Sequence, residues 1–313
     1  MKTKLLKGTQ IFIALFASAS LLHAAGVGTT GGQFLRVGVG ARAIGMGSSF
    51  SALADDSTAI YWNPAGLSQL EKKEIGVSYN AYFEDTASQF ISYAHPYEKG
   101  VCALSLKMLS VTDIEKRSAI GGDADTPNLG TFKTGDLAFS VAHSRKIDVG
   151  GKDLRLGLAL KYIASDLGPE SASTFALDLG SIYHLNDAWQ TSFAIQNIGG
   201  KLKFVDEGDP LPLRVKPGVA YKKDLANEGK LIGTLDADLL FVDKRYLINP
   251  GVEWWPKEMF AVRAGYQLGR DSDAGPGVSA GLGYRVSNVG IDYAFAPYGV
   301  LGNTHQISLA FKF

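Results

Sequence analysis

Apolar and polar residues alternate along this chain from about Glu74 to the last residue, and this pattern constrains the fold more than any other feature. The alternation comes in segments of about ten residues, which is typical of β-strands whose two faces meet different surroundings. In residues 154–162, for example, leucine or tyrosine alternates with arginine, glycine, alanine and lysine. Glycine accounts for 37 of 313 residues, which disfavours a helical protein because a glycine inside a helix costs about 1 kcal/mol relative to alanine. We count about fourteen segments, near 73–83, 86–97, 100–112, 131–146, 152–166, 172–183, 188–198, 213–222, 229–241, 245–255, 258–268, 276–286, 288–296 and 304–313.

Two folds accommodate such strands: a soluble β-sandwich with one solvated face, and a membrane β-barrel whose apolar face meets lipid. An even number of segments is what a single-chain bacterial barrel requires. Long connections follow odd-numbered segments, as at 113–130 and 199–212, whereas most even-numbered segments are followed by short turns, as at 147–151 and 287. Long loops on one rim and short turns on the other are typical of outer-membrane barrels. The pattern therefore favours the barrel.

Charged residues within the segments fall in the polar phase of the alternation. An arginine or lysine that faced lipid at the bilayer midplane would cost about 2 to 4 kcal/mol, so these side chains are expected to face the lumen. The lumen-lining candidates are Arg155, Lys161, Asp236, Asp238, Glu253, Arg263, Arg285 and Asp292.

The first residues have the order of a secretory signal, with lysines at 2, 4 and 7, an apolar run over 11–22, and Ala24 and Ala25 after it. A membrane anchor is the alternative, but the run is shorter than the roughly 18 apolar residues of a spanning helix. We therefore expect residues 1–24 to be a signal peptide. Lys plus Arg and Asp plus Glu both number 31, so the net charge provides no attraction to nucleic acid.

Residues 25–72 carry no sustained alternation and are rich in small residues. The stretch from Ser49 to Tyr61 can form short helical turns with Asp55, Asp56 and Ser57 as candidate caps, and the Asn63-Pro64 step would end them. Asp55 and Asp56 could also steer a ligand. We expect residues 25–72 to be a hatch inside the barrel formed by 73–313. The predicted fold class is all-β: a transmembrane antiparallel β-barrel of about 14 strands with a small N-terminal hatch.

Three stretches of this segment resemble a known family. The run from Gly38 to Gly47, followed by Ala54-Asp55-Asp56 and by residues 61–67, resembles the PorV/PorQ family of outer-membrane proteins, which belongs with the FadL-like fourteen-stranded barrels. The resemblance implies a non-enzymatic barrel in the bacterial outer membrane, associated with protein secretion or surface attachment of the type IX kind. The alternative that it implies is FadL-like passage of hydrophobic small molecules. The residues that carry the hatch motif are Gly45, Met46, Gly47, Asp55, Asp56, Trp62, Asn63, Pro64, Ala65 and Gly66.

The chain ends on a strand in which Ile307, Leu309, Phe311 and Phe313 share one face. This looks like the C-terminal signal strand read by the barrel assembly machinery, with Phe311 and Phe313 as its aromatic end; an ordinary closing strand is the alternative. The expected partners are thus outer-membrane lipid, that machinery, and either secretion-system proteins or a hydrophobic ligand.

Motifs that would indicate catalysis or metal binding are weak in this sequence. Residues 277–281 match G-x-S-x-G, but alternation continues through Ser279 where a hydrolase would need a strand-to-helix turn. The histidines are far apart, and Asp271 and Asp273 in a predicted loop, like Asp123 and Asp125 in another, lack the rest of a calcium motif. Cys102 shares the apolar phase and should face lipid. We therefore expect no enzyme, no cofactor and no metal.

Overall fold

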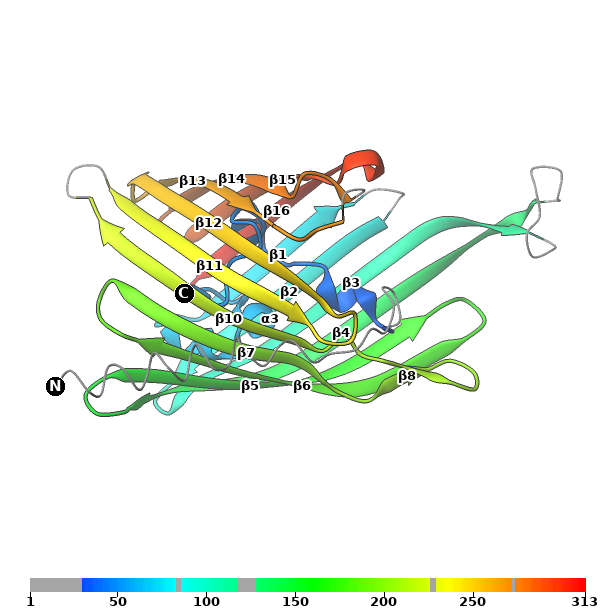
Figure 1. Ribbon diagram of the computed structural model, residues 1–313, viewed down its shortest axis with the longest axis horizontal. Helices are drawn as coiled ribbons and strands as arrows, with labels where there is room; N and C mark the ends of the chain where they lie inside the picture. The colour runs from blue at the N-terminus through cyan, green and yellow to red at the C-terminus, as the bar shows by residue number, and fades with distance from the viewer. Residues whose placement is uncertain (1–29, 83–85, 118–127, 226–228, 272–273) are drawn as a thin grey trace.

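The barrel is one closed antiparallel sheet of fourteen strands in a computed structural model that describes residues 30–82, 86–117, 128–225, 229–271 and 274–313 (Figure 1). The predicted signal peptide and Asp123, Asp125 and Asp273 lie outside these residues. The barrel strands are β1 Glu74–Ala81, β2 Thr86–Tyr97, β3 Gly100–Arg117, β4 Asn128–Asp148, β5 Asp153–Asp166, β6 Ser171–His184, β7 Trp189–Gly199, β10 Arg214–Asp224, β11 Lys230–Leu240, β12 Arg245–Lys257, β13 Phe260–Tyr266, β14 Val278–Val286, β15 Val289–Pro297 and β16 Asn303–Lys312.

The ring closes because β1 pairs with both β2 and β16, so that Glu74 lies opposite Ala94 on one side and Lys312 on the other. A closed single ring excludes the sandwich and confirms the barrel. Each of the fourteen predicted segments corresponds to one barrel strand. Among the described residues, no helix is of the length and apolarity that crossing a membrane would take.

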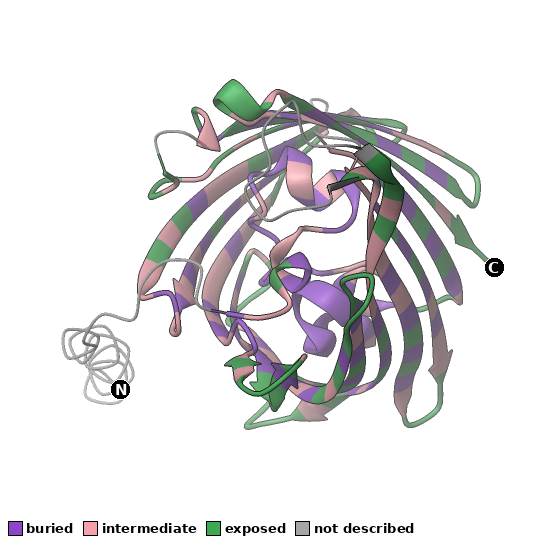
Figure 2. Ribbon diagram, turned by 90° about the vertical axis from the view of Figure 1, so that its right-hand side faces the viewer, coloured by how far each residue is buried: buried purple, intermediate pink, exposed green. Residues whose placement is uncertain are grey.

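The two faces of the strands follow the alternation. In β5, Leu158 and Leu160 point outward and are half-exposed, whereas Ala159 and Lys161 are buried on the inner side. Purple and green bands alternate along the strands in Figure 2 for this reason. The outer side chains therefore meet lipid and the inner ones meet the lumen.

Leu158→Arg tests this assignment. We expect it to lower the stability of the folded barrel by about 2 to 4 kcal/mol if residue 158 lies near the midplane, whereas Leu158→Ala, which adds no charge, should cost less. Urea unfolding in lipid bilayers measures both. Equal losses would contradict the lipid-facing assignment. Arginine at Ala159, on the inner face, does not serve as the control, because Ala159 is fully buried and an arginine there would be destabilising for reasons unrelated to lipid.

The rim with the long loops differs from the prediction in one place. Within the expected loop 113–130, residues 113–117 extend β3 to Arg117 and residues 128–130 begin β4, and these strand ends project at the right of Figure 1. Polar residues on both faces hide this extension from a pattern of alternating hydrophobicity. In the loop over 199–212, β8 Lys201–Lys203 pairs with β9 Gly208–Pro210.

The N-terminal segment, by which we mean residues 30–72, lies inside the ring (Figure 2). It contains η2 Gln33–Arg36, α2 Ala41–Gly45, α3 Ala59–Trp62 and η3 Pro64–Gln69. The helix α2 packs on strands β13–β16, and η3 packs on β3–β6. The segment thus bridges opposite walls of the barrel.

Local sequence explains part of this segment. The helix α3 ends at Trp62, and Asn63 is extended before Pro64, as expected for a residue that precedes proline. The predicted caps were wrong: Thr58 is the N-cap of α3, and Asp56 instead accepts a hydrogen bond from the Thr58 backbone N–H at 2.9 Å. The short helix α2 was not predicted, because its glycine-rich flanks read as irregular chain.

The C-terminal strand completes the wall. Phe313 exchanges two backbone hydrogen bonds with Lys73, of 2.9 and 3.1 Å, and the rings of Phe311 and Phe313 stack with centroids 5.6 Å apart on the outer surface. Both rings are half-exposed.

Changing both Phe311 and Phe313 to Ser is expected to prevent assembly, because the last strand loses its apolar, lipid-facing end. Heat-modifiable mobility on a gel reports assembly directly. Thr304→Ser, a change on the inner side of the same strand, is the control. A normal band shift in the double variant would show that these rings are not an assembly signal.

Candidate functional site

The wall presents bare backbone where the N-terminal segment rests on it. At six inward-facing glycines, a Cβ atom would lie within 3.0 Å of an atom of the segment, so a side chain there would displace the segment. At Gly265, for instance, the Cβ would overlap the backbone of Met46 and Gly47. The six, which we call the seat glycines, are Gly76, Gly157, Gly180, Gly218, Gly251 and Gly265.

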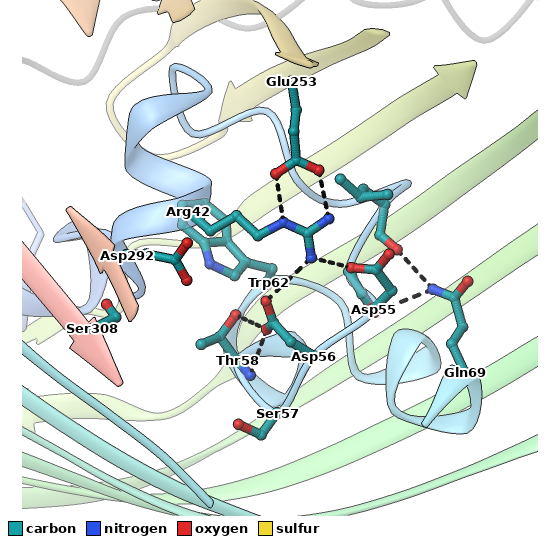
Figure 3. Close-up of polar contacts among 12 residues, drawn as sticks. Arg42, Asp55, Asp56, Ser57, Thr58, Trp62, Gln69, Glu253, Asp292 and Ser308 are labelled. Carbon is teal, nitrogen blue, oxygen red and sulfur yellow. Dashed lines mark hydrogen bonds and ion pairs between the residues drawn. The ribbon is translucent and has the colours of Figure 1, made fainter. Parts of the chain in front are cut away.

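A chain of alternating charges ties the segment to the wall, and Figure 3 shows the part of it from Asp55 through Arg42 to Glu253. Arg42 of α2 donates two hydrogen bonds of 2.8 Å to Glu253 of β12 and one of 2.5 Å to Asp55. Glu253 also accepts from Arg263 at 2.6 Å, and Arg263 in turn donates to Asp292 at 2.8 Å. The chain ends with Arg285, which donates two hydrogen bonds to the carboxylate of Asp292, of 3.0 and 2.7 Å. Because each charge has an opposite partner, burial of the whole set is tolerated.

A second charged group lies against residues 48–62. The carboxylate of Asp236 accepts hydrogen bonds from the backbone N–H groups of Phe50 and Ser51 at 3.0 and 2.8 Å. Lys216 lies 4.0 Å from Asp236 and 4.8 Å from the centre of the Trp62 ring. The latter contact is a cation–π interaction.

The other lumen candidates are spread along the wall. Asp238 binds Arg214, and Lys161 pairs with Asp178 at 2.7 Å. Arg155 donates to the backbone oxygen of Ser68 in η3. All eight predicted side chains therefore face inward, but they form separate groups and not one cluster.

The motif residues lock the segment's own turns. Asn63 accepts from the Ala65 N–H at 3.1 Å and donates to the backbone oxygens of Ser51 and Ser181, at 3.0 and 3.2 Å. The Trp62 indole donates to Val39 at 2.9 Å. A Cβ at Gly66 would overlap Ala54, so only glycine fits there. Asn63 thus holds together two turns of the segment and strand β6.

Ser279, from the G-x-S-x-G match, has a different role. It lies on the inner face of β14, and its hydroxyl accepts a hydrogen bond of 3.0 Å from the Gly47 backbone N–H. No strand-to-helix turn surrounds it, since β14 continues from Val278 to Val286. It holds the glycine turn against the wall.

The strands bring together three side chains that sequence spacing kept apart. His95, Cys102 and His143 are paired neighbours on β2, β3 and β4, and the Cys102 sulfur lies 3.8 Å from Nδ1 of His143 on the outer surface. Cys102 is exposed there, in agreement with its predicted lipid-facing phase. Across the part of the chain that the structure describes, no group of three or more such side chains is arranged to hold a metal ion.

Asp55 and Asp56 differ in their electrostatics. Burial opposes ionisation of Asp55, but the charges of Arg42 and Lys222 outweigh it and hold its pKa below the usual value. For Asp56, burial, followed by repulsion from Glu74, raises the pKa to about 6. The two neighbours thus ionise over different pH ranges.

Asp56→Asn is expected to raise stability near neutral pH. A carboxyl whose folded-state pKa is about 6, against 3.8 unfolded, contributes stability that is complete below the lower value and is lost as pH rises through the higher one. The wild type should therefore lose stability against urea as the pH rises from 3.8 through about 6, and the variant should lose less. Identical pH dependence of the two unfolding midpoints would contradict this.

A cavity of about 810 Å³ lies where the N-terminal segment meets the short-turn rim. Charged residues of both signs line it, among them Arg42, Asp56, Glu74, Lys230 and Lys257. Its lining mixes these charged groups with apolar side chains, and it therefore differs from the largely apolar sites that usually bind hydrophobic small molecules.

Sequence reasoning missed several residues of this region. Arg42 lies within the recognised motif, but its partner Glu253 is 211 positions away, and no local signal joins them. Arg214 and Lys216 could have been found, because they occupy the same polar phase as the predicted lumen residues.

A closed barrel of fourteen strands, apolar outside and charged inside, is an outer-membrane β-barrel, and the protein resides in the bacterial outer membrane. The chain belongs to the PorV family, since the family model described as "Type IX secretion system protein PorV" matches residues 23–245. The toluene transporters TbuX of Ralstonia pickettii and TodX of Pseudomonas putida share its fold, each with a TM-score of 0.60. TbuX is 13% identical, with 88% of this chain and 98% of that chain covered, and TodX is 12% identical, with 93% and 99% covered.

Among curated proteins, the UPF0164 protein of Treponema pallidum (strain Nichols) is 25% identical over 194 residues. The match covers 56% of this chain but 45% of that protein, so the chain spans less than half of the relative's length.

Proposed function

We propose that this protein acts in protein secretion or surface attachment of the type IX kind, as a non-enzymatic barrel whose N-terminal segment plugs the lumen. The observation that carries the proposal, together with family membership, is the charge chain from Asp55 through Arg42 and Glu253 to Arg285. A lumen closed by such a lock leaves the rims and outer surface as the places where other proteins can bind. Secretion-system proteins are the proposed partners.

Passage of hydrophobic small molecules is the second candidate. The fold shared with the toluene transporters TbuX and TodX favours it. The charged lining of the cavity at the short-turn rim favours secretion instead, because an apolar solute gains nothing from charged groups and would have to displace their water.

A deletion strain separates the two. If the protein serves secretion, its loss should leave surface-attached proteins in the periplasm, and uptake of labelled toluene should stay normal. Re-expression of the wild-type chain is the control. Normal surface attachment together with lost toluene uptake would overturn the proposal in favour of the second candidate.

A further inference from the structure

The cavity at the short-turn rim has the features of a binding site. We propose that it binds the ammonium or guanidinium group of a basic side chain, carried by a polypeptide segment, through the carboxylates of Asp56 and Glu74. The short-turn rim of such barrels faces the periplasm, so the segment would belong to a periplasmic protein. The site deepens the proposed function, on which its biological role rests.

Glu74 supplies the first carboxylate. Its side chain is 1% exposed and lines the cavity. One carboxylate oxygen accepts a hydrogen bond of 2.8 Å from the Ser57 backbone N–H, and the other has no hydrogen-bond partner. The ammonium group of Lys312 lies 3.5 Å from that second oxygen, but its side chain is 49% exposed and can move into solvent. A buried carboxylate oxygen without a hydrogen bond is costly and is stabilised by a cationic donor.

Asp56 supplies the second carboxylate. It accepts hydrogen bonds from the backbone N–H and the hydroxyl of Thr58, which are neutral groups. Its nearest cation is Arg42, at 3.7 Å, and that guanidinium is already hydrogen-bonded to Glu253 and Asp55. Asp56 and Glu74 therefore adjoin each other, and their two cations are Arg42, which two other carboxylates share, and the half-exposed Lys312. The raised pKa of Asp56 agrees with incomplete neutralisation of the pair.

The surroundings select an organic cation over a metal ion. Calcium takes six to eight oxygen ligands, whereas no group of three or more candidate ligand residues occurs among the described residues. A volume of about 810 Å³ suits an organic group. Phe90 and Ile232, both buried, line the same cavity and can cover the aliphatic stem of a lysine or arginine.

The mouth of the cavity selects a polypeptide over a free polyamine. Lys230, Lys257 and Lys312 line it, together with Asp224 and Glu258. A polyamine carries positive charge along its whole length and would be repelled by the three lysines. A peptide can place one basic side chain at Asp56 and Glu74 and its acidic groups against the lysines.

Calorimetry on the purified full-length protein in detergent micelles tests the site. The probes are a capped hexapeptide with one lysine and one glutamate, the same peptide with norleucine in place of lysine, and spermidine. We expect the lysine peptide to bind at least about tenfold more tightly than the norleucine peptide, and E74Q and D56N each to weaken it by about tenfold, because each removes one charge from a desolvated pair. D271N, at the opposite rim, should bind like the wild type.

Equal binding of the lysine and norleucine peptides to the wild type would overturn the proposal, and this comparison does not depend on whether a variant folds. Tighter binding of spermidine than of the lysine peptide, lost in E74Q, would contradict the polypeptide ligand and show that the site binds a free polyamine. Displacement of the peptide by millimolar calcium would contradict the organic cation and show that the site binds a metal ion. A secretion defect in the deletion strain without peptide binding would leave the proposed function standing and remove this site alone.

Discussion

A barrel that lacks residues 26–70 is expected to insert into the membrane and to conduct ions in discrete steps, whereas the full-length protein stays nearly silent. Removal of the segment leaves the lipid-facing residues and the closing strand intact. The wall charges also keep partners of their own, since Arg263 still binds Glu253 and Arg285 still binds Asp292. The emptied lumen would then be polar and wet, as barrel interiors are when nothing fills them. Single-channel recording in planar bilayers measures the difference.

Two results would contradict this expectation. If the full-length protein conducts as well as the truncated one, residues 30–72 do not plug the lumen, and the proposed lock has no function in closure. If the truncated chain fails to insert, the segment is required for assembly. The claim that it acts as a plug independently of assembly is then overturned.

Gly265→Val is expected to open the same path by a single substitution. The new side chain would occupy the space of the Met46–Gly47 backbone, so it should push the glycine turn off β13 and break the hydrogen bond between Gly47 and Ser279. Overpacking of this kind costs about 1 to 3 kcal/mol or more. We expect a lower urea midpoint and measurable conductance in the variant.

Gly233→Val is the matched control. Gly233 lies on the outer face of β11, where a Cβ atom would meet nothing within 4 Å, and valine suits a strand better than glycine does. It should be silent in the bilayer and at least as stable as the wild type. Equal conductance from both variants would show that the seat glycines do not hold the segment.

The wall of this barrel could be predicted from the sequence because lipid and lumen impose opposite demands on successive residues. Leu158 and Lys161 reveal their faces by chemistry alone, and the same holds for every strand that crosses the membrane. The signal fails where both faces are wet, which is why the ends of β3 and β4 beyond the rim read as a loop.

The interior could be predicted only in part. Composition and motif assigned Asp55 and Asp56 to the N-terminal segment. They did not predict that Arg42 binds both Asp55 and Glu253. Those contacts depend on which wall strand stands behind which turn, and that follows from ring closure between elements distant in the chain. The seat glycines show the same limit: the glycine excess was visible, but its purpose appears only when the segment is seen against the wall.

The pairing of the first barrel strand with the last sets an order of construction. Strand β1 reaches its second neighbour only when residues 303–312 arrive, so the ring stays open until the chain is complete. Residues 30–72 precede every strand, and their contacts run to walls on both sides. Because these contacts reach strands on both sides of the ring, they can be completed only when the strands of both walls are in place, and the hydrogen bonds between Lys73 and Phe313 then join the two ends of the sheet directly after the segment. Closure of the ring and enclosure of the segment are thus coupled through one short stretch of chain, residues 72–74.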